Sequence, residues 1–277
     1  MDLTISIVSY NSKDLLRECI SSIYKYFKSI SFEIIVVDNG SKDRTSEMII
    51  KEFPKVKLIR NKANLFFTKA NNQALKIARG RYLLILNQDT YFTDNSFKKT
   101  IDYMDQNRDV AVCEGLEIYE DGKIVPTGSK FSTPLIDFYE LSLFGKKISN
   151  KKLIKEYRIS NRSRKSVFEV DVACDAFLCV RKEILDKIKG YDETFLLFYT
   201  ENDLCLRIKK LGFKIIHYGP SKVIHRVSSS TELLGWKKQD IYYRDLLHYY
   251  QKNKFSIQGY LLYSLLKAEE IILKILK

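Results

Sequence analysis

The chain has 277 residues, of which 45% are hydrophobic, and its formal net charge is +13. This is enough apolar material for a sizeable core, either in one large domain or in one domain with an appendage. The charge favours anionic partners such as nucleic acid, acidic lipid or phosphorylated substrates. However, the basic residues are widely spread and no nucleic-acid-binding motif accompanies them, so composition gives no support to a nucleic-acid partner.

The sequence shows no targeting signal and no disulfide pattern. The sequence has neither a signal-peptide pattern nor an apolar run long enough to cross a bilayer. No cysteine belongs to a CxxC pair, and all of them lie in apolar patterns: Cys19, Cys113, Cys174, Cys179 and Cys205. We therefore expect buried, reduced thiols and a cytosolic protein.

Strand-like and helix-like segments alternate in the first part of the chain. Short apolar runs predict strands at residues 3–9, 33–38, 56–60 and 81–87. Apolar residues at helical spacing predict helices around 15–23, 45–53 and 68–78, the last followed by Gly80 as its C-terminal cap. This alternation predicts a parallel sheet with helices on both faces, in which ligands bind at the carboxyl ends of the strands.

Three of the predicted strands end in polar residues. One polar residue after a strand is ordinary turn chemistry. Three such ends at one edge of a sheet form a stronger pattern, because the carboxyl ends of parallel strands meet there. The sequence therefore predicts a ligand site built from residues 9–11, 38–39 and 87–89.

Phosphate binding would need an unusual arrangement here. The sequence contains neither GxGxxG nor GxxxxGK[ST], so the glycine-rich phosphate loops of dinucleotide-binding and P-loop folds are missing. If phosphates bind, another group must neutralise them. A divalent cation on Asp89 would do so, since hard oxygen ligands and phosphate oxygens suit magnesium or manganese.

The pattern beyond residue 110 is more mixed. It predicts strands at 110–118, 168–172, 213–218 and 222–226, and helices near 181–188 and 201–211. Residues 145–166 contain many lysines and arginines but a single acid, Glu156. This composition predicts a mobile basic loop, with a plain solvated linker as the alternative.

Four blocks together resemble the family 2 glycosyltransferases, and most closely their rhamnosyltransferase-like members. The blocks are "TISIVSYNSKDLLRECISSI", "FEIIVVDNGSKDRT", "NLFFTKANNQALKIARGRYLLILNQDT" and "GYDETFLLFYTENDLCLRIKKLGFKIIHYGPSKVIH". The resemblance covers most of residues 3–226. It implies an α/β GT-A fold, which is a Rossmann-like, mostly parallel sheet flanked by helices. It also implies a nucleotide-sugar donor, a divalent metal (Mn²⁺ or Mg²⁺), inversion at the anomeric carbon and a part in surface polysaccharide synthesis.

The resemblance also implies roles for individual residues. Asn87-Gln88-Asp89 occupies the place of the family's DxD-type motif, so Asp89 would bind a metal that bridges the donor diphosphate, and His225 would complete the metal shell. Asp38 would accept a hydrogen bond from the N–H of a pyrimidine base, in a dTDP- or UDP-linked donor. The remaining substrate-binding residues that it implies are Ser9, Tyr10, Asn11, Asn39, Asn64, Ala70, Asn71 and Asn87. For Asp38 the alternative is a turn or capping residue, and for His225 a structural donor.

The catalytic base would be a carboxylate, because an inverting transfer needs a group that takes the proton of the acceptor hydroxyl. Aligning "DLCLR" without a gap places Glu201 where the family has its basic Asp, with Asp203 as a supporting acid. The alternative for both is that a helix start favours acids through its dipole. Asp175 stands where the family usually has a small residue, and we expect it to contact an acceptor hydroxyl.

Two other classes of function remain as alternatives. The altered "TEND" and the missing first acid of the DxD motif fit a non-catalytic nucleotide-sugar-binding scaffold, although Asp89, Glu201 and His225 argue for an enzyme. A nucleotidyltransferase would also use an α/β sheet and metal. It would usually have a glycine-rich, basic phosphate loop where this chain has "VSYNSKD".

The C-terminal part predicts two amphipathic helices, at 231–254 and 256–277, after a transferase domain of residues 1–230. Both combine basic residues with aromatic or aliphatic ones, which suits an anionic membrane surface without a spanning segment. They would place the enzyme on the inner face of the cell membrane, near a glycan or polyprenyl-diphosphate-linked acceptor. The alternatives are packing on the core and a homodimer seam.

Overall fold

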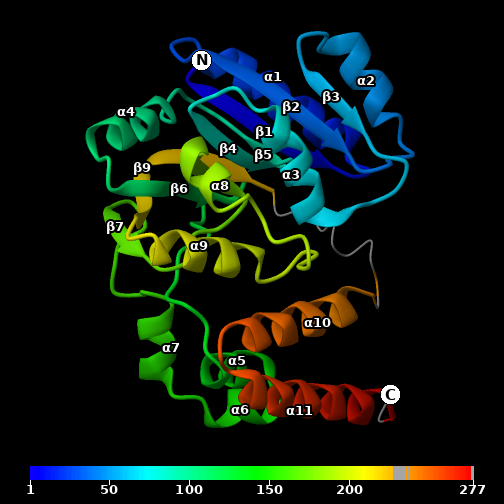
Figure 1. Cartoon of the computed structure of the whole chain (residues 1–277), viewed down its shortest axis with the longest axis vertical. Helices are drawn as coiled ribbons and strands as arrows, with labels where there is room; N and C mark the ends of the chain where they lie inside the picture. The colour runs from blue at the N-terminus through cyan, green and yellow to red at the C-terminus, as the bar shows by residue number, and fades with distance from the viewer. Residues whose placement is uncertain (227–234, 236, 276–277) are drawn as a thin grey trace.

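The computed structural model describes residues 1–226, 235 and 237–275. Its first part alternates strands and helices as predicted, from β1 (Leu3–Ser9) to β4 (Tyr82–Asn87) (Figure 1). Between them lie α1 (Lys13–Tyr26), β2 (Phe32–Asp38), α2 (Thr45–Glu52), β3 (Lys57–Arg60) and α3 (Phe66–Ile77). The remaining strands are β5 (Thr90–Tyr91), β6 (Val110–Ile118), β7 (Val167–Val170), β8 (Phe177–Arg181) and β9 (Lys214–His225). The helices α4 (Lys98–Gln106), α8 (Lys182–Lys187) and α9 (Thr200–Lys210) pack beside these strands.

The first four major strands form the parallel half of one sheet, in the order β3-β2-β1-β4. Their register aligns Ser9 with Asp38, and Val8 with Asn87. The polar strand ends therefore lie at one edge, as the sequence predicted. Parallel strands covered on both faces read as continuous apolar runs, and every residue of β1 except Val8 is indeed buried.

The rest of the sheet makes it mixed rather than uniformly parallel. β8 runs antiparallel between β4 and β6, and the order continues through β9 to β5, while β7 pairs with β9. The sequence did not predict β8, which ends at the residue where the helix near 181–188 was expected to begin. It also predicted two strands where β9 is one, with a register irregularity opposite Gly115 and Leu116.

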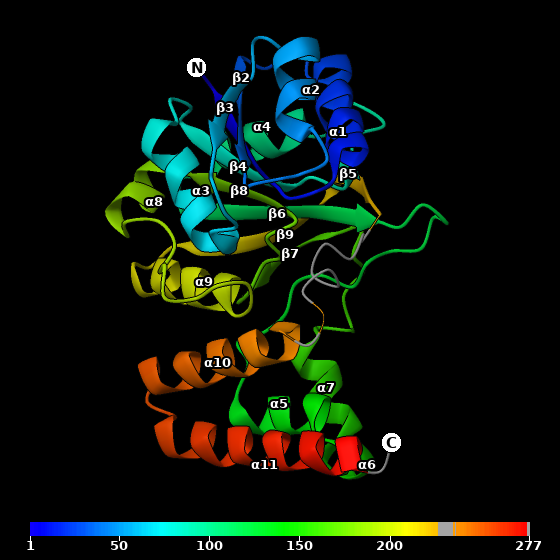
Figure 2. The same ribbon diagram turned by 90° about the vertical axis from the view of Figure 1, so that its right-hand side faces the viewer.

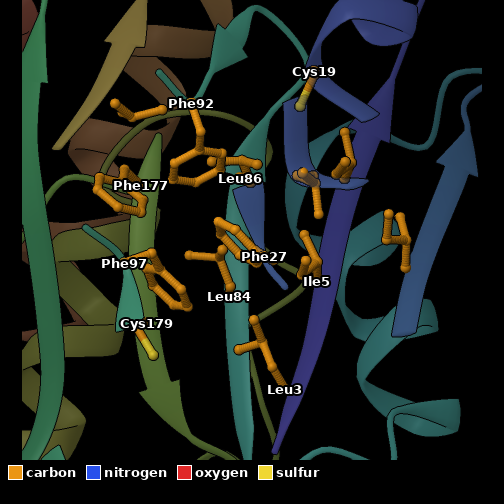
Figure 3. Close-up of a cluster of buried hydrophobic side chains, with 14 of the residues drawn as sticks. Leu3, Ile5, Cys19, Phe27, Leu84, Leu86, Phe92, Phe97, Phe177 and Cys179 are labelled. Carbon is orange, nitrogen blue, oxygen red and sulfur yellow. The ribbon is translucent and has the colours of Figure 1, made fainter. Parts of the chain in front are cut away.

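A cluster of aromatic side chains forms the centre of the core between the sheet and helices α1 and α4 (Figure 3). The ring centroid of Phe27 lies 4.6 Å from that of Phe92 and 5.1 Å from that of Phe97, and Phe177 packs against both of the latter. Burying each such ring contributes roughly 1.5–3 kcal/mol. Gly115 on β6 is required by this packing, because a Cβ there would lie 1.9 Å from the Phe177 ring.

Two local predictions need correction. Gly80 is not a left-handed helix cap, because it is absent from the residues with positive φ. It is instead needed for a close approach, since a Cβ on it would lie 2.3 Å from the backbone nitrogen of Thr4. Residues 145–166 are also not simply a loop. They contain the end of α6 (Leu143–Ile148) and all of α7 (Lys151–Tyr157), whose first N–H groups are capped by Ser142 and Asn150.

A separate group of helices, which we call the helical layer, lies below the sheet and its flanking helices in Figures 1 and 2. It combines α5 (Pro134–Leu141), α6 and α7 with α10 (Lys237–Lys252) and α11 (Ser256–Ile275). The two predicted C-terminal helices are thus confirmed over these bounds, whereas residues 231–234, 236 and 276–277 and the predicted domain boundary at 230 lie outside the described residues. No helix in the described part of the chain is long and apolar enough to cross a membrane.

A buried carboxylate ties this layer together. Asp137 on α5 is only 5% exposed and accepts hydrogen bonds from the hydroxyls of Ser132, Tyr199 and Tyr250. Burial raises the pKa of Asp137, although the three donors oppose that shift. The carboxyl group therefore connects α5 both to α10, through Tyr250, and to the residue that precedes α9.

Helix α10 holds the loop that leads into α9. The Oδ2 atom of Asp245 accepts hydrogen bonds of 3.0 Å from three consecutive backbone N–H groups, those of residues 196–198. Two other contacts fasten the start of the same loop: Arg244 donates to the Thr194 carbonyl at 2.9 Å, and Lys252 pairs with Asp192 at 2.6 Å. The loop therefore depends on α10 for its conformation.

We predict that Asp245→Ala loosens this loop. Removal of one carboxylate leaves three backbone donors without their acceptor, which should lower the free energy of unfolding by about 2–4 kcal/mol. Amides 196–198 should lose hydrogen-exchange protection. Asp240→Ala is the matched control on the same helix, because the ion pair that Asp240 forms with Lys267 is exposed and its loss should leave amides 196–198 protected. Equal protection of amides 196–198 in both variants would contradict the prediction.

Candidate functional site

A cavity of about 350 Å³ opens at the carboxyl ends of β1 and β4. Its walls come from the ends of these strands, the start of α3, residues 174–176, Leu197 and the first turn of α9. Of the residues predicted for the site, it brings together Tyr10, Asn39, Asn64, Asn71, Asn87, Asp89, Asp175, Glu201 and His225. Residues from distant parts of the sequence thus line one polar-edged cavity.

One side of the cavity carries a carboxylate–imidazole–carboxylate arrangement. His225 ends β9, and its Nε2 lies 3.4 Å from Oδ1 of Asp89, while its Nδ1 lies 2.6 Å from Oε2 of Glu117. Strand pairing places it there, because His225 is the residue opposite Thr90 in the β5–β9 ladder. Burial by itself would lower the pKa of His225, but the hydrogen bonds to Asp89 and Glu117 outweigh it and raise the pKa to about 9.

This arrangement fits a divalent metal ion. Asp89 and His225 offer an oxygen and a nitrogen to the same point, and Glu117 is placed to orient the imidazole from behind. The other carboxylate oxygen of Glu117, Oε1, is buried and has no hydrogen-bond partner in the structure. Within the described ranges no three His, Cys, Asp or Glu side chains converge on one point. A metal here would therefore also need ligands from a substrate or from water.

The other side of the cavity carries two neighbouring carboxyl groups. The Thr200 hydroxyl lies 2.9 Å from Oδ2 of Asp175 and 3.0 Å from Oε2 of Glu201. Tyr191 donates a hydrogen bond of 2.9 Å to the other oxygen of Asp175. Burial raises the pKa of Asp175 well above its usual range, with the negative charge of Glu201 adding to the effect, and burial also raises the pKa of Glu201. Such a carboxyl pair can hold and release a proton at a higher pH than exposed carboxyl groups would.

Amide side chains organise the rest of the cavity. Asn39 donates a 3.0 Å hydrogen bond to the Phe66 carbonyl, and Asn64 accepts one of 2.8 Å from the Phe66 N–H. Asn71 accepts a 2.8 Å hydrogen bond from Ser6 under the cavity floor. The two hydrogen bonds to the Phe66 backbone hold this residue at a positive φ of 62°, which a bulky residue seldom adopts.

Five of the predicted site residues do not line the cavity. Asp38 accepts hydrogen bonds from the Ser41 N–H and the Ser46 hydroxyl, and Asn11 accepts one from the Lys42 N–H, so both hold the loop before α2. Ser9 and Ala70 are fully buried, Ala70 in a small apolar cluster with Ile35 and Val37. Base recognition by Asp38 and nucleotide contacts from the other three remain predictions.

Asp203 is the fifth predicted site residue that does not line the cavity, and its carboxylate is held by ion pairs within the protein. It forms ion pairs of 2.7 Å with Arg207 and 2.6 Å with Lys252, and its side chain is 2% exposed. The acid thus joins α9 to α10 and does not line the cavity, unlike Glu201. A role for Asp203 in supporting the base would have to act through this helix contact.

Sequence reasoning missed several residues of the site. Gln88 accepts a 3.1 Å hydrogen bond from the Tyr10 N–H and so joins two strand ends, and Thr200 bridges the carboxyl pair. Glu117 contacts His225 across 108 positions of sequence, so no local pattern could have indicated it.

The profile of the family described as "Glycosyl transferase family 2" matches residues 4–188. An uncharacterized glycosyltransferase of Methanocaldococcus jannaschii is 26% identical over 260 residues, which are 91% of this chain and 80% of that protein. A poly(ribitol-phosphate) beta-glucosyltransferase of Bacillus spizizenii is 26% identical over 58% of this chain and 27% of its own length. The chain spans only 55% and 58% of the length of two further relatives.

A solved structure shares the fold. It is the mannosyltransferase PcManGT from Pyrobaculum calidifontis in complex with GDP-Man and Mn²⁺, with a TM-score of 0.57 and 16% identity over 96% of this chain and 68% of that one. The expected GT-A α/β fold is thereby confirmed, with a mixed sheet flanked by helices. The profile match covers more than half of the chain, and on this ground the chain belongs to glycosyltransferase family 2.

Proposed function

We propose that this glycosyltransferase is an inverting, metal-dependent enzyme that moves a hexose-type sugar, rhamnose in our sequence-based hypothesis, from a dTDP- or UDP-linked donor. The acceptor that we propose is a growing glycan or a polyprenyl-diphosphate-linked glycan of a surface polysaccharide. One observation carries the proposal. A single cavity has the metal-competent pair Asp89 and His225 on one wall and the buried carboxylate Glu201 on another.

The base follows from this geometry. Glu201 would take the proton of the acceptor hydroxyl while that oxygen forms a bond to the anomeric carbon and the bond to the diphosphate breaks. Its raised pKa keeps Glu201 closer to the working pH than an exposed glutamate would be, which favours proton transfer. Thr200 would position the carboxylate of Glu201. Contact between Asp175 and an acceptor hydroxyl remains our prediction, and both oxygens of Asp175 accept hydrogen bonds within the protein, from Tyr191 and Thr200.

Asp89 and His225 would hold Mn²⁺ or Mg²⁺, which neutralises the charge of the leaving diphosphate when it is bound. Support comes from the buried Glu117 behind His225 and from the Mn²⁺ in the complex of PcManGT. A non-catalytic nucleotide-sugar-binding scaffold is the alternative. It would need the metal pair but not the hydrogen-bonded carboxyl pair, so the presence of both favours the enzyme.

The donor test is binding. Thermal shifts with dTDP-, UDP- and GDP-sugars in the presence of Mn²⁺ should identify the donor, because a ligand of the native state raises apparent stability. Asp89→Ala, or a chelator with the unchanged protein, should weaken donor binding at least about tenfold. Asp94→Ala is the control, because Asp94 does not line the cavity and instead pairs with Lys222 and accepts a hydrogen bond from the Ser96 N–H. Donor affinity that resists both the chelator and Asp89→Ala would rule out the metal.

The base test separates two neighbouring acids. Glu201→Gln should lower sugar transfer by about 10²–10⁴-fold while donor affinity stays within a few-fold, because the amide cannot accept the proton. Asp203→Asn should retain transfer and lose stability, since its charge pairs with Arg207 and Lys252. An active Glu201→Gln variant beside an inactive, folded Asp203→Asn variant would reverse the assignment.

Metal binding should depend on pH through His225. Its pKa of about 9 means that the imidazole is protonated in the metal-free protein at neutral pH, and a metal needs it neutral. Mn²⁺ affinity, measured by calorimetry with nucleotide present, should therefore rise by up to about tenfold per pH unit between pH 7 and 9. His225→Gln should remove this rise and His248→Gln should not. A flat profile in the unchanged protein would show that His225 is not a ligand.

A further inference from the structure

Helix α11 has two apolar sides, and the described residues of the chain cover one of them. Gly259, Leu262 and Leu266 are buried, and the two leucines belong to the cluster that joins α11 to α10. On the outer side, Ile257 is 75% exposed, Leu261 67% and Ile275 77%. The outer stripe runs at helical spacing through uncharged, exposed residues only: Ile257, Leu261, Ser264, Ala268, Ile272 and Ile275.

Helix α6 lies beside α11 and has exposed apolar side chains of its own. It exposes three apolar side chains, with Leu143 at 45%, Phe144 at 58% and Ile148 at 53%. The first N–H groups of α6 are bound by Glu269 of α11, at 2.9 Å for Leu143. Both views of the molecule show the two helices side by side at the edge farthest from the sheet (Figures 1 and 2). We call the outer stripe of α11 and the exposed apolar residues of α6 the α6–α11 face.

The charged side chains of α6 have one sign. This helix contains no acid, and its two lysines, Lys146 and Lys147, are exposed. Neither lysine forms an ion pair with a residue that the structure describes. The acids of α11 are already engaged, because Glu269 caps α6 and Glu270 pairs with Lys267 and Lys274.

We propose that the α6–α11 face binds the surface of an anionic lipid bilayer. Apolar side chains would enter the region between headgroups and acyl chains, while Lys146 and Lys147 of α6 contact the acidic headgroups. The charges favour this occupant over a second copy of the chain, since a two-fold pairing through the face would bring basic edges together. The helix lies on the membrane and does not span it.

This inference goes beyond the proposed transfer reaction and is tested without it. Purified full-length protein is sedimented with vesicles of phosphatidylcholine containing 30% phosphatidylglycerol, and with phosphatidylcholine alone. We expect binding to the anionic vesicles, and at least about tenfold weaker binding without the anionic lipid or at high salt. No binding to anionic vesicles at low salt would overturn the proposal.

Variants locate the surface. Leu261→Gln combined with Ile272→Gln should reduce vesicle affinity at least about tenfold, since both side chains are exposed and would be the buried ones on the membrane. Lys146→Glu with Lys147→Glu should act similarly at low salt only. The matched controls are on the opposite layer: Ile50→Gln on α2, which is 58% exposed, and Lys51→Glu beside it. Equal losses in the control variants would overturn the assignment.

Sedimentation velocity distinguishes the alternative occupant. The proposal expects a monomer in the absence of lipid, and circular dichroism should show unchanged melting for the exposed-site variants. A dimer that dissociates when Leu261 and Ile272 are replaced would assign the face to a second copy instead. Donor binding and the effect of Glu201→Gln are independent of this result, so a failure here leaves the proposed reaction untouched.

Discussion

The parallel register of β1 with β2 and β4 is the constraint on which the site depends. Because Ser9 aligns with Asp38, and Val8 with Asn87, the chain leaves all three strands at the same height. A slip of one residue would turn the side chains of a strand to the opposite face of the sheet, and Asp89 would no longer meet His225. Such a slip would also break the hydrogen bonds that Thr4 donates to Glu33 and Ser6 donates to Asn71.

The two walls of the cavity are held by different contacts. The wall with Asp89 is part of the sheet, where β5 and β9 pair directly beside Asp89. The wall that carries Glu201 follows a loop whose backbone is held by Asp245 of α10. The position of Glu201 therefore depends on helix α10, whereas that of Asp89 depends on strand pairing.

The sequence predicted the parallel half of the sheet and the convergence of its polar ends because these depend on local patterns: apolar runs, helical spacing and turns. It could not predict β8, whose five residues are uniformly buried and look like part of any apolar segment. It misjudged residues 145–166 because lysine content outweighed the capping residues Ser142 and Asn150. Glu117 was out of reach, since its partner His225 is set by strand order and not by neighbouring sequence.

The hydrogen bonds of Asp137 have a consequence for how such a protein can diversify. Its carboxyl group is buried between hydroxyls from three separated segments: the residues before α5, Tyr199 before α9 and Tyr250 on α10. A buried acid that loses such partners is strongly destabilising. Recombination that exchanged the C-terminal helices alone would remove Tyr250 and leave Asp137 buried without one of its hydrogen-bond donors. New helices at this end of the chain would have to arrive together with a compatible α5, so the two regions are expected to be inherited as one unit.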